Sequence, residues 1–198
     1  IGILSPGIWR ERGAVATLLG GEPVRIGGFG PGACDLVVGW GHKSTARKAR
    51  RMAGRERRPY VALEDGFLRS VRPGAAERAI GWIVDRSGIY YDAHGPSDLE
   101  KAIGRRAGRQ TVEDDDRARA ALAAIRDLRL SKYNHAPMAT AEALGLPRGR
   151  DVVVVIDQTF ADASVSGSLS DGATFVHMLD AAIAENPGRT VVVKVHPE

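Results

Sequence analysis

The stretch from residue 151 to residue 195, DVVVVIDQTFADASVSGSLSDGATFVHMLDAAIAENPGRTVVVKV, decides the fold class. It opens with the apolar run Val152–Ile156 and closes with a second run, Val191–Val195. The first run is typical of a strand that is buried on both faces of a sheet. Between the runs, apolar residues recur on one helix face, at Phe175, Met178, Leu179, Ala182 and Ile183. The stretch therefore predicts a strand, a helix and a parallel strand, joined by a right-handed crossover.

The same alternation of apolar runs and helical segments continues toward the N-terminus. The expected strands are Ile1–Leu4, Val24–Ile26, Leu36–Val38, Tyr60–Leu63 and Trp82–Val84. One helix is expected to start at Ser97, because Ser97 and Glu100 have the spacing of a capping box. Another is expected after the acidic run 113–116, with Leu122, Ile125 and Leu128 on one apolar stripe. The pattern predicts an α/β fold with a mostly parallel sheet covered by helices on both faces.

A turn-rich connector, Leu146–Arg150, precedes the deciding stretch. We therefore expect two subdomains, residues 1–147 and residues 148–198. Because the chain starts inside one apolar run and stops just after another, we interpret it as part of a longer protein.

Composition excludes several classes of protein. With 43% hydrophobic and 26% charged residues, the chain has the composition of an ordinary globular domain rather than a disordered one. The single cysteine, Cys34, excludes an internal disulfide. No stretch approaches the roughly 20 apolar residues that a membrane-spanning helix needs. We expect a cytoplasmic location.

Basic residues are concentrated between Lys43 and Arg58, where Glu56 is the single acid. The segment is interpreted either as a solvated helix face or as a site for phosphate groups on anionic lipid or nucleic acid. No aromatic residue is interleaved through it, so stacking on nucleic-acid bases is unsupported. Attraction to a membrane surface ranks above nucleic acid.

Polar residues of catalytic type follow three of the expected strands. They are Glu64-Asp65-Gly66, the stretch from Asp157 to Ser164, and His196-Pro197-Glu198. Ligands of parallel α/β sheets bind beyond the carboxyl ends of the strands, so these groups are candidates for a site in a cleft between two subdomains. Each also has a structural interpretation: a surface turn, a helix cap at Asp162 and Ser164, and a packed histidine.

The sequence predicts no metal site. No cysteine and histidine cluster has zinc spacing. The run Asp114-Asp115-Asp116 is like the acidic metal motif of some enzymes that use nucleotide sugars, but its place at the start of an amphipathic helix explains it.

Six short strings, in order along the chain, carry a resemblance to a known family. They are EDGFLRS (64–70), GIYYDA (88–93), PSDLE (96–100), KYN (132–134), DQTFADAS (157–164) and KVHPE (194–198). Through them the sequence resembles the capsule polysaccharide biosynthesis family. Within it, the resemblance is to bacterial transferases that add β-linked 3-deoxy-D-manno-oct-2-ulosonic acid (Kdo) to a lipid anchor.

The resemblance implies two Rossmann-like subdomains of the GT-B type, the second incomplete in this chain. It also implies a glycosyltransferase that uses CMP-Kdo and retains the β configuration. The implied acceptor is a phosphatidylglycerol-linked glycolipid or its growing Kdo chain, at the inner face of the bacterial inner membrane. We expect no cofactor or metal ion, and no nucleic-acid partner. Because family members continue past the His-Pro-Glu string, we expect residues 1–198 alone to be inactive.

Residue roles follow from the resemblance and from the chemistry of a CMP-linked sugar. Asp162 is the expected nucleophile, with Asp157 as the other candidate, and Glu64 the expected group for proton transfer at the acceptor hydroxyl. His196 is expected to bind the leaving phosphate. The remaining donor-side residues are Pro197, Gln158, Ser164, Asp157 and Glu198. The expected sugar or acceptor contacts are Asp65, Gly66 and Arg69.

Two alternatives remain open at the level of sequence. An acidic pair before glycine, together with His-Pro, is also similar to bacterial sialyltransferases, which use another CMP-linked keto-sugar acid. A different class is a noncatalytic module that binds a nucleotide or a lipid.

Overall fold

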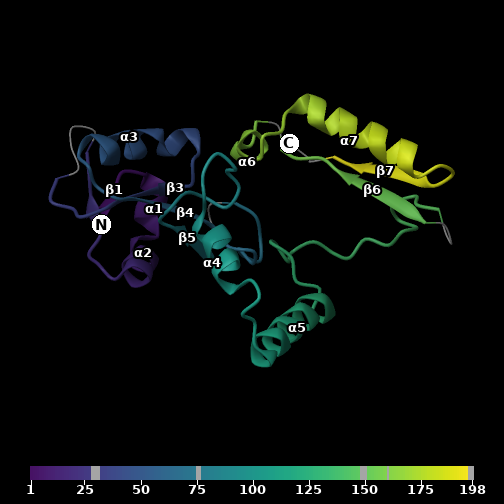
Figure 1. Cartoon of the computed structure of the whole chain (residues 1–198), viewed down its shortest axis with the longest axis horizontal. Helices are drawn as coiled ribbons and strands as arrows, with labels where there is room; N and C mark the ends of the chain where they lie inside the picture. The colour runs from purple at the N-terminus through teal and green to yellow at the C-terminus, as the bar shows by residue number, and fades with distance from the viewer. Residues whose placement is uncertain (28–31, 75–76, 148–150, 160, 196–198) are drawn as a thin grey trace. The chain divides into compact units, whose positions relative to one another are not determined.

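A computed structural model describes residues 1–27, 32–74, 77–147, 151–159 and 161–195 (Figure 1). The chain divides into two compact units, Ile1–Ala136 and Pro137–Glu198. Residues 137–147 contain neither helix nor strand, and the first strand of the second unit starts at Val152. The subdomain boundary near residue 147 therefore stays a prediction.

The first unit is built on a five-stranded sheet. Its strands lie in the order β2 (Val24–Arg25), β1 (Gly2–Ile3), β3 (Val37–Trp40), β4 (Tyr60–Asp65) and β5 (Trp82–Asp85). All neighbours are parallel except β4 and β5. No helix occurs among the described residues between β4 and β5, so the chain returns directly and antiparallel. The prediction of a mostly parallel sheet is confirmed.

Helices cover both faces of this sheet. They are α1 (Pro6–Arg10), α2 (Arg12–Leu19) and α3 (Arg47–Arg55), the last preceded by the single turn η1 (Ser44–Ala46). Figure 1 shows α2 and α3 on opposite sides of the strands. The neighbouring residues Val37 and Val38 belong to two different apolar clusters, because successive side chains of a strand point to opposite faces. β3 is therefore buried on both sides.

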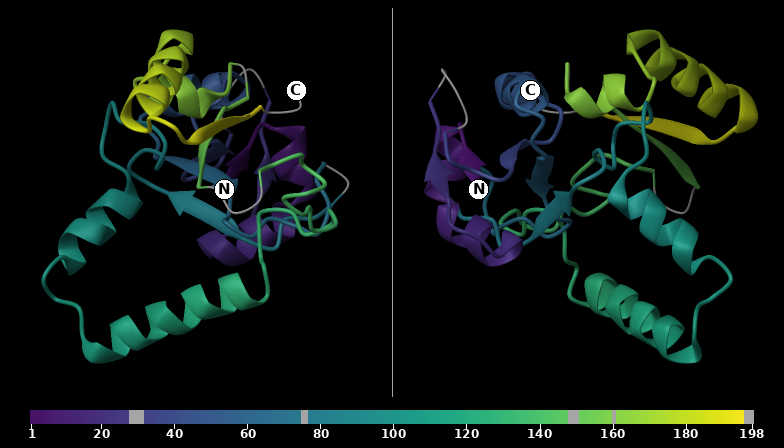
Figure 2. Two further views of the ribbon diagram at one scale, coloured as in Figure 1. Left: turned by 90° about the vertical axis from the view of Figure 1, so that its right-hand side faces the viewer. Right: turned by 60° about the vertical axis from the view of Figure 1, so that its left-hand side comes forward.

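Two further helices, α4 (Asp98–Arg106) and α5 (Val112–Asp127), follow each other as separate rods (Figure 2). The predicted start at Ser97 is confirmed, since its hydroxyl accepts a hydrogen bond from the Glu100 amide at 3.0 Å. Neither helix contains a buried residue, and in the apolar stripe expected on α5, Leu122 and Leu128 are exposed and Ile125 is half-buried. None of the helices in the described ranges is long and apolar enough to cross a membrane.

The second unit has two parallel strands, β6 (Val152–Ile156) and β7 (Thr190–Lys194), and the helices α6 (Ala163–Gly167) and α7 (Gly172–Glu185). The predicted strand, helix and parallel strand are thus confirmed. The prediction that the first strand is buried on both faces is wrong, because Val154 and Ile156 are each 53% exposed. In the described part of this unit α7 covers the two strands from one side, and the opposite side has no cover.

Asp85 connects the end of β5 to the start of α4 through hydrogen bonds of its side chain. Its side chain is 2% exposed. One carboxylate oxygen accepts from the amides of Ser87 and Gly88 at 2.9 and 2.7 Å, and the other accepts from the Asp98 amide at 3.1 Å. The carboxylate therefore holds both the turn after β5 and the first turn of α4.

Replacing Asp85 with alanine should lower the free energy of unfolding of the first unit by about 3 kcal/mol or more, because three amides lose a charged acceptor. Urea denaturation followed by tryptophan fluorescence measures this, since all three tryptophans, Trp9, Trp40 and Trp82, lie in that unit. Asp115→Ala is the matched control, as its side chain is 57% exposed. Equal losses in both variants would contradict the role of Asp85.

Candidate active site

Two parallel strands bring chemically active side chains to one edge of the first unit's sheet. β3 ends at Trp40 and continues into Gly41-His42-Lys43, and β4 ends with Glu64 and Asp65. The carboxyl ends of neighbouring parallel strands meet at the same edge, which is where ligands bind in such sheets. This edge is the candidate site of the first unit.

The turn at Gly41 positions the residues that follow β3. Its φ of 44° lies in the left-handed region. The Gly41 amide donates to the Leu63 carbonyl at 2.9 Å, and its carbonyl accepts from the Tyr60 hydroxyl at 2.8 Å. A Cβ here would stand 2.1 Å from the Tyr91 hydroxyl and 3.0 Å from Glu64 Oε2. The position therefore requires glycine, and the Tyr91 hydroxyl and Glu64 Oε2 lie beside the same turn.

Glu64 is a buried carboxylate, with its side chain 8% exposed. Its Oε1 accepts from Lys43 Nζ at 3.3 Å and from the Asp65 amide at 3.2 Å. Its Oε2 is shielded from solvent and has no hydrogen-bond partner among the described residues. A buried carboxylate is costly unless paired, so Lys43 supplies the compensating charge. The sequence identified Glu64 correctly as a strand-end residue, and its predicted role in proton transfer stays a prediction.

An aspartate bridges two histidines at the same edge. His42 Nδ1 lies 2.6 Å from Asp92 Oδ2, and His94 Nδ1 lies 2.8 Å from Asp92 Oδ1. The hydrogen bond from His42 is the largest cause that lowers the pKa of Asp92, to about 2. Asp92 is therefore a carboxylate at neutral pH.

Two tyrosines near this edge keep their protons. Burial raises the pKa of the Tyr60 hydroxyl well above its ordinary value. Burial also raises the pKa of Tyr90, with a further contribution from the negative charge of Glu64. Both therefore remain hydrogen-bond donors at neutral pH, and Tyr60 uses its proton to hold the Gly41 turn.

Asp65, Gly66 and Arg69 lie in the loop that leaves β4. Asp65 pairs with Arg69 Nε at 3.4 Å and with Lys132 Nζ at 3.9 Å. Arg69 Nη1 also donates to the Ser70 hydroxyl and to the Glu77 carbonyl, both at 2.8 Å. Gly66 packs against the backbone of Gly81, where a Cβ would stand 2.7 Å from the Gly81 carbonyl carbon. These contacts organise the loop, and binding of a sugar or an acceptor by the three residues stays a prediction.

Three of the strings that carry the resemblance lie together in the first unit. Residues 69 and 70 donate their amides to the Lys132 carbonyl at 3.1 and 3.3 Å, and the Asn134 amide donates to Val71. The string at 88–93 supplies Tyr91 and Asp92, which contact His42. The candidate site is thus assembled from segments far apart in sequence.

In the second unit, the predicted donor-side residues that the structure describes follow the end of β6. Asp157 continues the pairing of the strands, its amide donating to the Lys194 carbonyl at 3.0 Å, and its Oδ1 accepts from the Gln158 amide at 2.8 Å. Asp162 is the N-cap of α6, where its Oδ1 accepts from the Ser164 amide at 2.8 Å. The structural interpretation of Asp162 as a helix cap is therefore correct, and its chemical role stays a prediction. His196, Pro197 and Glu198 lie outside the described residues.

Sequence reasoning missed His42, Tyr91 and Asp92. The expected strand at 36–38 stopped two residues short of β3, so the Gly-His-Lys sequence was not recognised as a strand end. Tyr91 and Asp92 belong to a string that carried the resemblance but received no role. The signal that could have identified His42 was a histidine two residues after an apolar strand.

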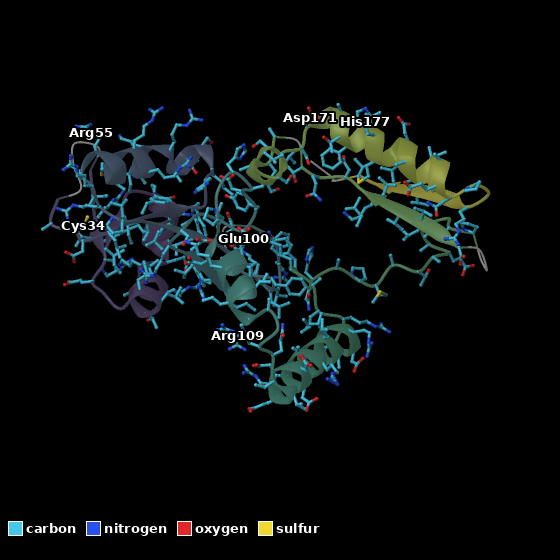
Figure 3. All side chains as sticks on the ribbon, in the orientation of Figure 1. Cys34, Arg55, Glu100, Arg109, Asp171 and His177 are labelled. Carbon is cyan, nitrogen blue, oxygen red and sulfur yellow. The ribbon has the colours of Figure 1, made fainter. Side chains whose placement is uncertain are left out.

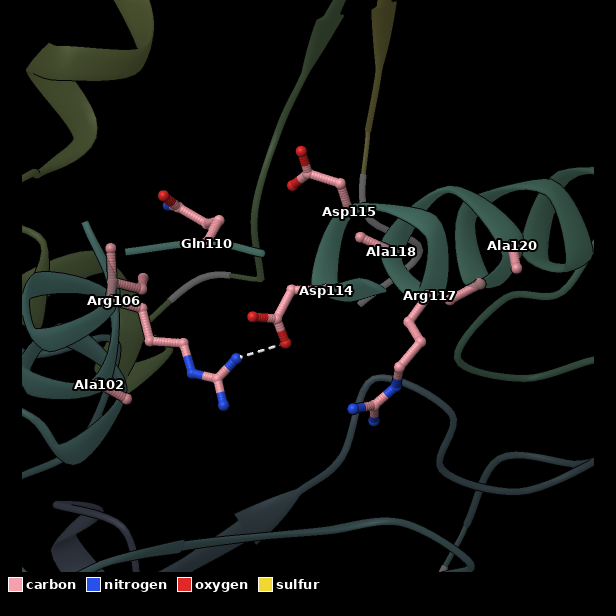
Figure 4. A pocket seen from close by; sticks show the side chains of 10 residues that line it. Ala102, Arg106, Gln110, Asp114, Asp115, Arg117, Ala118 and Ala120 are labelled. Atoms are coloured by element: carbon pink, nitrogen blue, oxygen red, sulfur yellow. Dashed lines mark hydrogen bonds and ion pairs between the residues drawn. The ribbon is translucent and has the colours of Figure 1, made fainter. Parts of the chain in front are cut away.

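The acidic run at Asp114 has a structural role. Thr111 and Asp114 form a capping box at the start of α5, and Asp114 accepts from Arg106 Nη1 at 2.7 Å. Figure 4 shows this pair in a hollow of about 860 Å³ between α4 and α5. Across the described residues, no group of three or more histidine, cysteine or acidic side chains has a geometry that could hold a metal ion.

The sequence of the chain is similar to that of a known protein family. Residues 35–198 match the family described as capsule polysaccharide biosynthesis protein. The capsule polysaccharide modification protein LipA of Neisseria meningitidis serogroup A is 42% identical over 171 residues, which are 85% of this chain and 24% of that protein. The lipopolysaccharide-processing protein LpsZ of Rhizobium meliloti is 33% identical over 165 residues, 83% of this chain and 37% of that protein.

Two solved structures are similar to the whole chain. The β-Kdo 2,4 transferase of Thermosulfurimonas dismutans KpsC has 44% identity and a TM-score of 0.86, over 100% of this chain and 60% of that chain. The β-Kdo 2,7 transferase of the same protein has a TM-score of 0.69 and 22% identity, and the match covers 100% of this chain and 60% of that chain. At this identity it supports the fold alone. The chain thus spans only part of each relative. The match over residues 35–198 shows that the chain belongs to the capsule polysaccharide biosynthesis family.

Proposed function

We propose that the chain is part of a glycosyltransferase that transfers β-Kdo from CMP-Kdo with retention of configuration. The proposed acceptor is a phosphatidylglycerol-linked glycolipid or a growing Kdo chain. The observation that carries the proposal is the 44% identity, at a TM-score of 0.86 and over the whole chain, to the KpsC β-Kdo 2,4 transferase. The carboxylates at the strand ends of both units support it, because a sugar cation in the transition state needs negative charge nearby.

The proposed architecture is a GT-B transferase with two Rossmann-like subdomains. Residues 1–147 form the acceptor-side subdomain, and residues 148–198 begin the subdomain that binds the CMP-sugar. Two compact units, each with parallel strands that end in polar residues, support this division. Nucleotide and sugar ligands bind at such strand ends in α/β folds.

Retention is most simply achieved by two successive inversions at the anomeric carbon, and we propose Asp162 as the nucleophile of the first inversion. Its position at the start of α6 supports the assignment, because the loop after the carboxyl end of a parallel strand is where the donor phosphate is expected to bind. Asp157, Gln158, Ser164, His196, Pro197 and Glu198 complete the proposed donor side. The leaving group is a monophosphate that fixed hydrogen-bond donors can hold, so we propose transfer without a metal ion or cofactor.

The proposed partner surface is an anionic membrane on the cytoplasmic side. On α3 and its flanks, Arg47, Lys48, Arg51, Arg55 and Arg57 are exposed. Arg50 instead donates to the His42 carbonyl at 3.2 Å. Figure 3 shows Arg55 among the basic side chains on the outer side of α3. Such a surface is attracted to anionic lipid, and we propose no nucleic-acid partner.

One alternative function has a specific basis in the sequence: a transferase that uses CMP-sialic acid, which shares the keto-acid sugar chemistry of Kdo. Supplying CMP-Kdo and CMP-sialic acid in turn to the complete protein distinguishes the two. A noncatalytic module would bind a donor without turnover while both Asp162 and Glu64 are intact.

The complete protein, incubated with CMP-Kdo and no acceptor, should gain the mass of one Kdo residue, and peptide mapping should place it on Asp162. Asp162→Ala should lose the adduct and lower transfer by about 10³-fold or more, because the first displacement has no nucleophile. Asp180→Asn on the exposed side of α7 is the matched control. An adduct on Asp157, or full activity in Asp162→Ala, would contradict the assignment.

Changing Arg47, Arg51, Arg55 and Arg57 together to glutamine should weaken binding to vesicles that contain phosphatidylglycerol. At about 1 kcal/mol per basic residue, the loss is on the order of 10²–10³-fold at low salt and shrinks as salt rises. Cosedimentation measures it. The matched control changes the exposed arginines Arg105, Arg109, Arg117 and Arg126. If both quadruple variants lose the same amount of vesicle binding, or if the α3 variant loses none, the proposal is contradicted. The basic segment is then a solvated helix face.

A further inference from the structure

The proposed transfer needs a group that takes the proton of the acceptor hydroxyl. We infer that this group is the imidazole of His42, oriented by the carboxylate of Asp92, rather than Glu64. The inference rests on the proposed function and adds a catalytic residue and a positioning residue to it.

His42 is held at several points beyond the end of β3. Its amide donates to the Tyr91 hydroxyl at 3.0 Å, and its carbonyl accepts from Arg50 Nη2 at 3.2 Å. Its Nδ1 lies 2.6 Å from Asp92 Oδ2. A neutral imidazole that donates from Nδ1 to a carboxylate carries its lone pair on Nε2. The arrangement is that of a base and its orienting group, as in other acid–base catalysts.

Glu64 is less suited to contact an acceptor. Its side chain is 8% exposed, against 24% for His42. Its Oε1 already accepts from Lys43 and from the Asp65 amide, and its Oε2 is shielded from solvent. Of the two side chains, His42 is therefore the more exposed to an acceptor hydroxyl.

The group that faces His42 Nδ1 carries a negative charge. Asp92 is a carboxylate at neutral pH, because its hydrogen bonds hold its pKa at about 2. An adjacent carboxylate stabilises the imidazolium that forms when the base takes a proton. Among the described residues, the other charged or titratable groups that contact His42, Asp92 or the Gly41 turn are Lys43, Arg50, Tyr60, Glu64, Tyr91 and His94.

The proposed step belongs to the second displacement. The acceptor oxygen forms a bond to the anomeric carbon of the Kdo held on Asp162, and the bond between that carbon and the Asp162 oxygen breaks. The acceptor proton moves to His42 Nε2, and Asp162 leaves as a carboxylate. The imidazolium then returns its proton to solvent, so charge and atoms balance.

The test uses the complete protein with CMP-Kdo and a Kdo-bearing lipid acceptor. His42→Ala should lower acceptor transfer by about 10²–10⁴-fold, the usual contribution of a general base. It should still release one equivalent of CMP and form the Asp162 adduct, because the first displacement does not involve the acceptor. Added imidazole should restore part of the transfer. Asp92→Asn should lower kcat with little change in the KM for the donor.

His177→Ala is the matched control, since His177 is exposed on α7 (Figure 3) and lies outside the proposed machinery. It should transfer like the unmodified protein. Transfer at the unmodified rate by His42→Ala overturns the inference. So does a loss of transfer in His42→Ala that imidazole does not restore and that is accompanied by loss of CMP release, because it indicates a structural role. Absence of any CMP-Kdo turnover in the unmodified protein instead refutes the proposed function on which the inference rests.

Discussion

The side chain of Glu64 is buried at the carboxyl end of β4, and a buried carboxylate needs a partner for its charge. Lys43 supplies that partner, and it reaches Glu64 because the chain turns sharply at Gly41. The hydroxyls of Tyr60 and Tyr91 bond to the backbone of this turn, so the loop around Tyr91 is attached to the end of β3. The geometry at the carboxyl edge of the first unit's sheet thus depends on the contacts that stabilise the buried charge of Glu64.

Local features of the fold were predictable from the sequence, and features that depend on distant partners were not. The start of α4 at Ser97 and the two strands around α7 follow from capping and periodicity, which neighbouring residues decide. The burial of Val154 and Ile156 was predicted wrongly, because an apolar strand is covered only if another element packs on it. The antiparallel pairing of β5 was not anticipated; it follows from the absence of a crossover helix among the described residues between β4 and β5.

In the candidate site, too, residues with a local sequence signal were predictable and residues that depend on distant partners were not. Glu64, Asp65 and Asp157 were identified because they directly follow apolar runs, and Asp162 was identified through the resemblance to the family. The pair of His42 and Asp92 was not, because 50 residues separate them and only the folded chain brings Nδ1 within 2.6 Å of the carboxylate. Residues joined by such long-range contacts carry no sequence signal of their partnership.

The configuration of the product is the measurement that tests the proposed transfer of Kdo with retention. The complete protein, CMP-Kdo and a lipid acceptor should give a product whose anomeric centre is β, as determined by NMR, because two inversions restore the configuration of the donor. An α-linked product would contradict retention. Consumption of CMP-sialic acid with no consumption of CMP-Kdo would contradict the assignment of the donor.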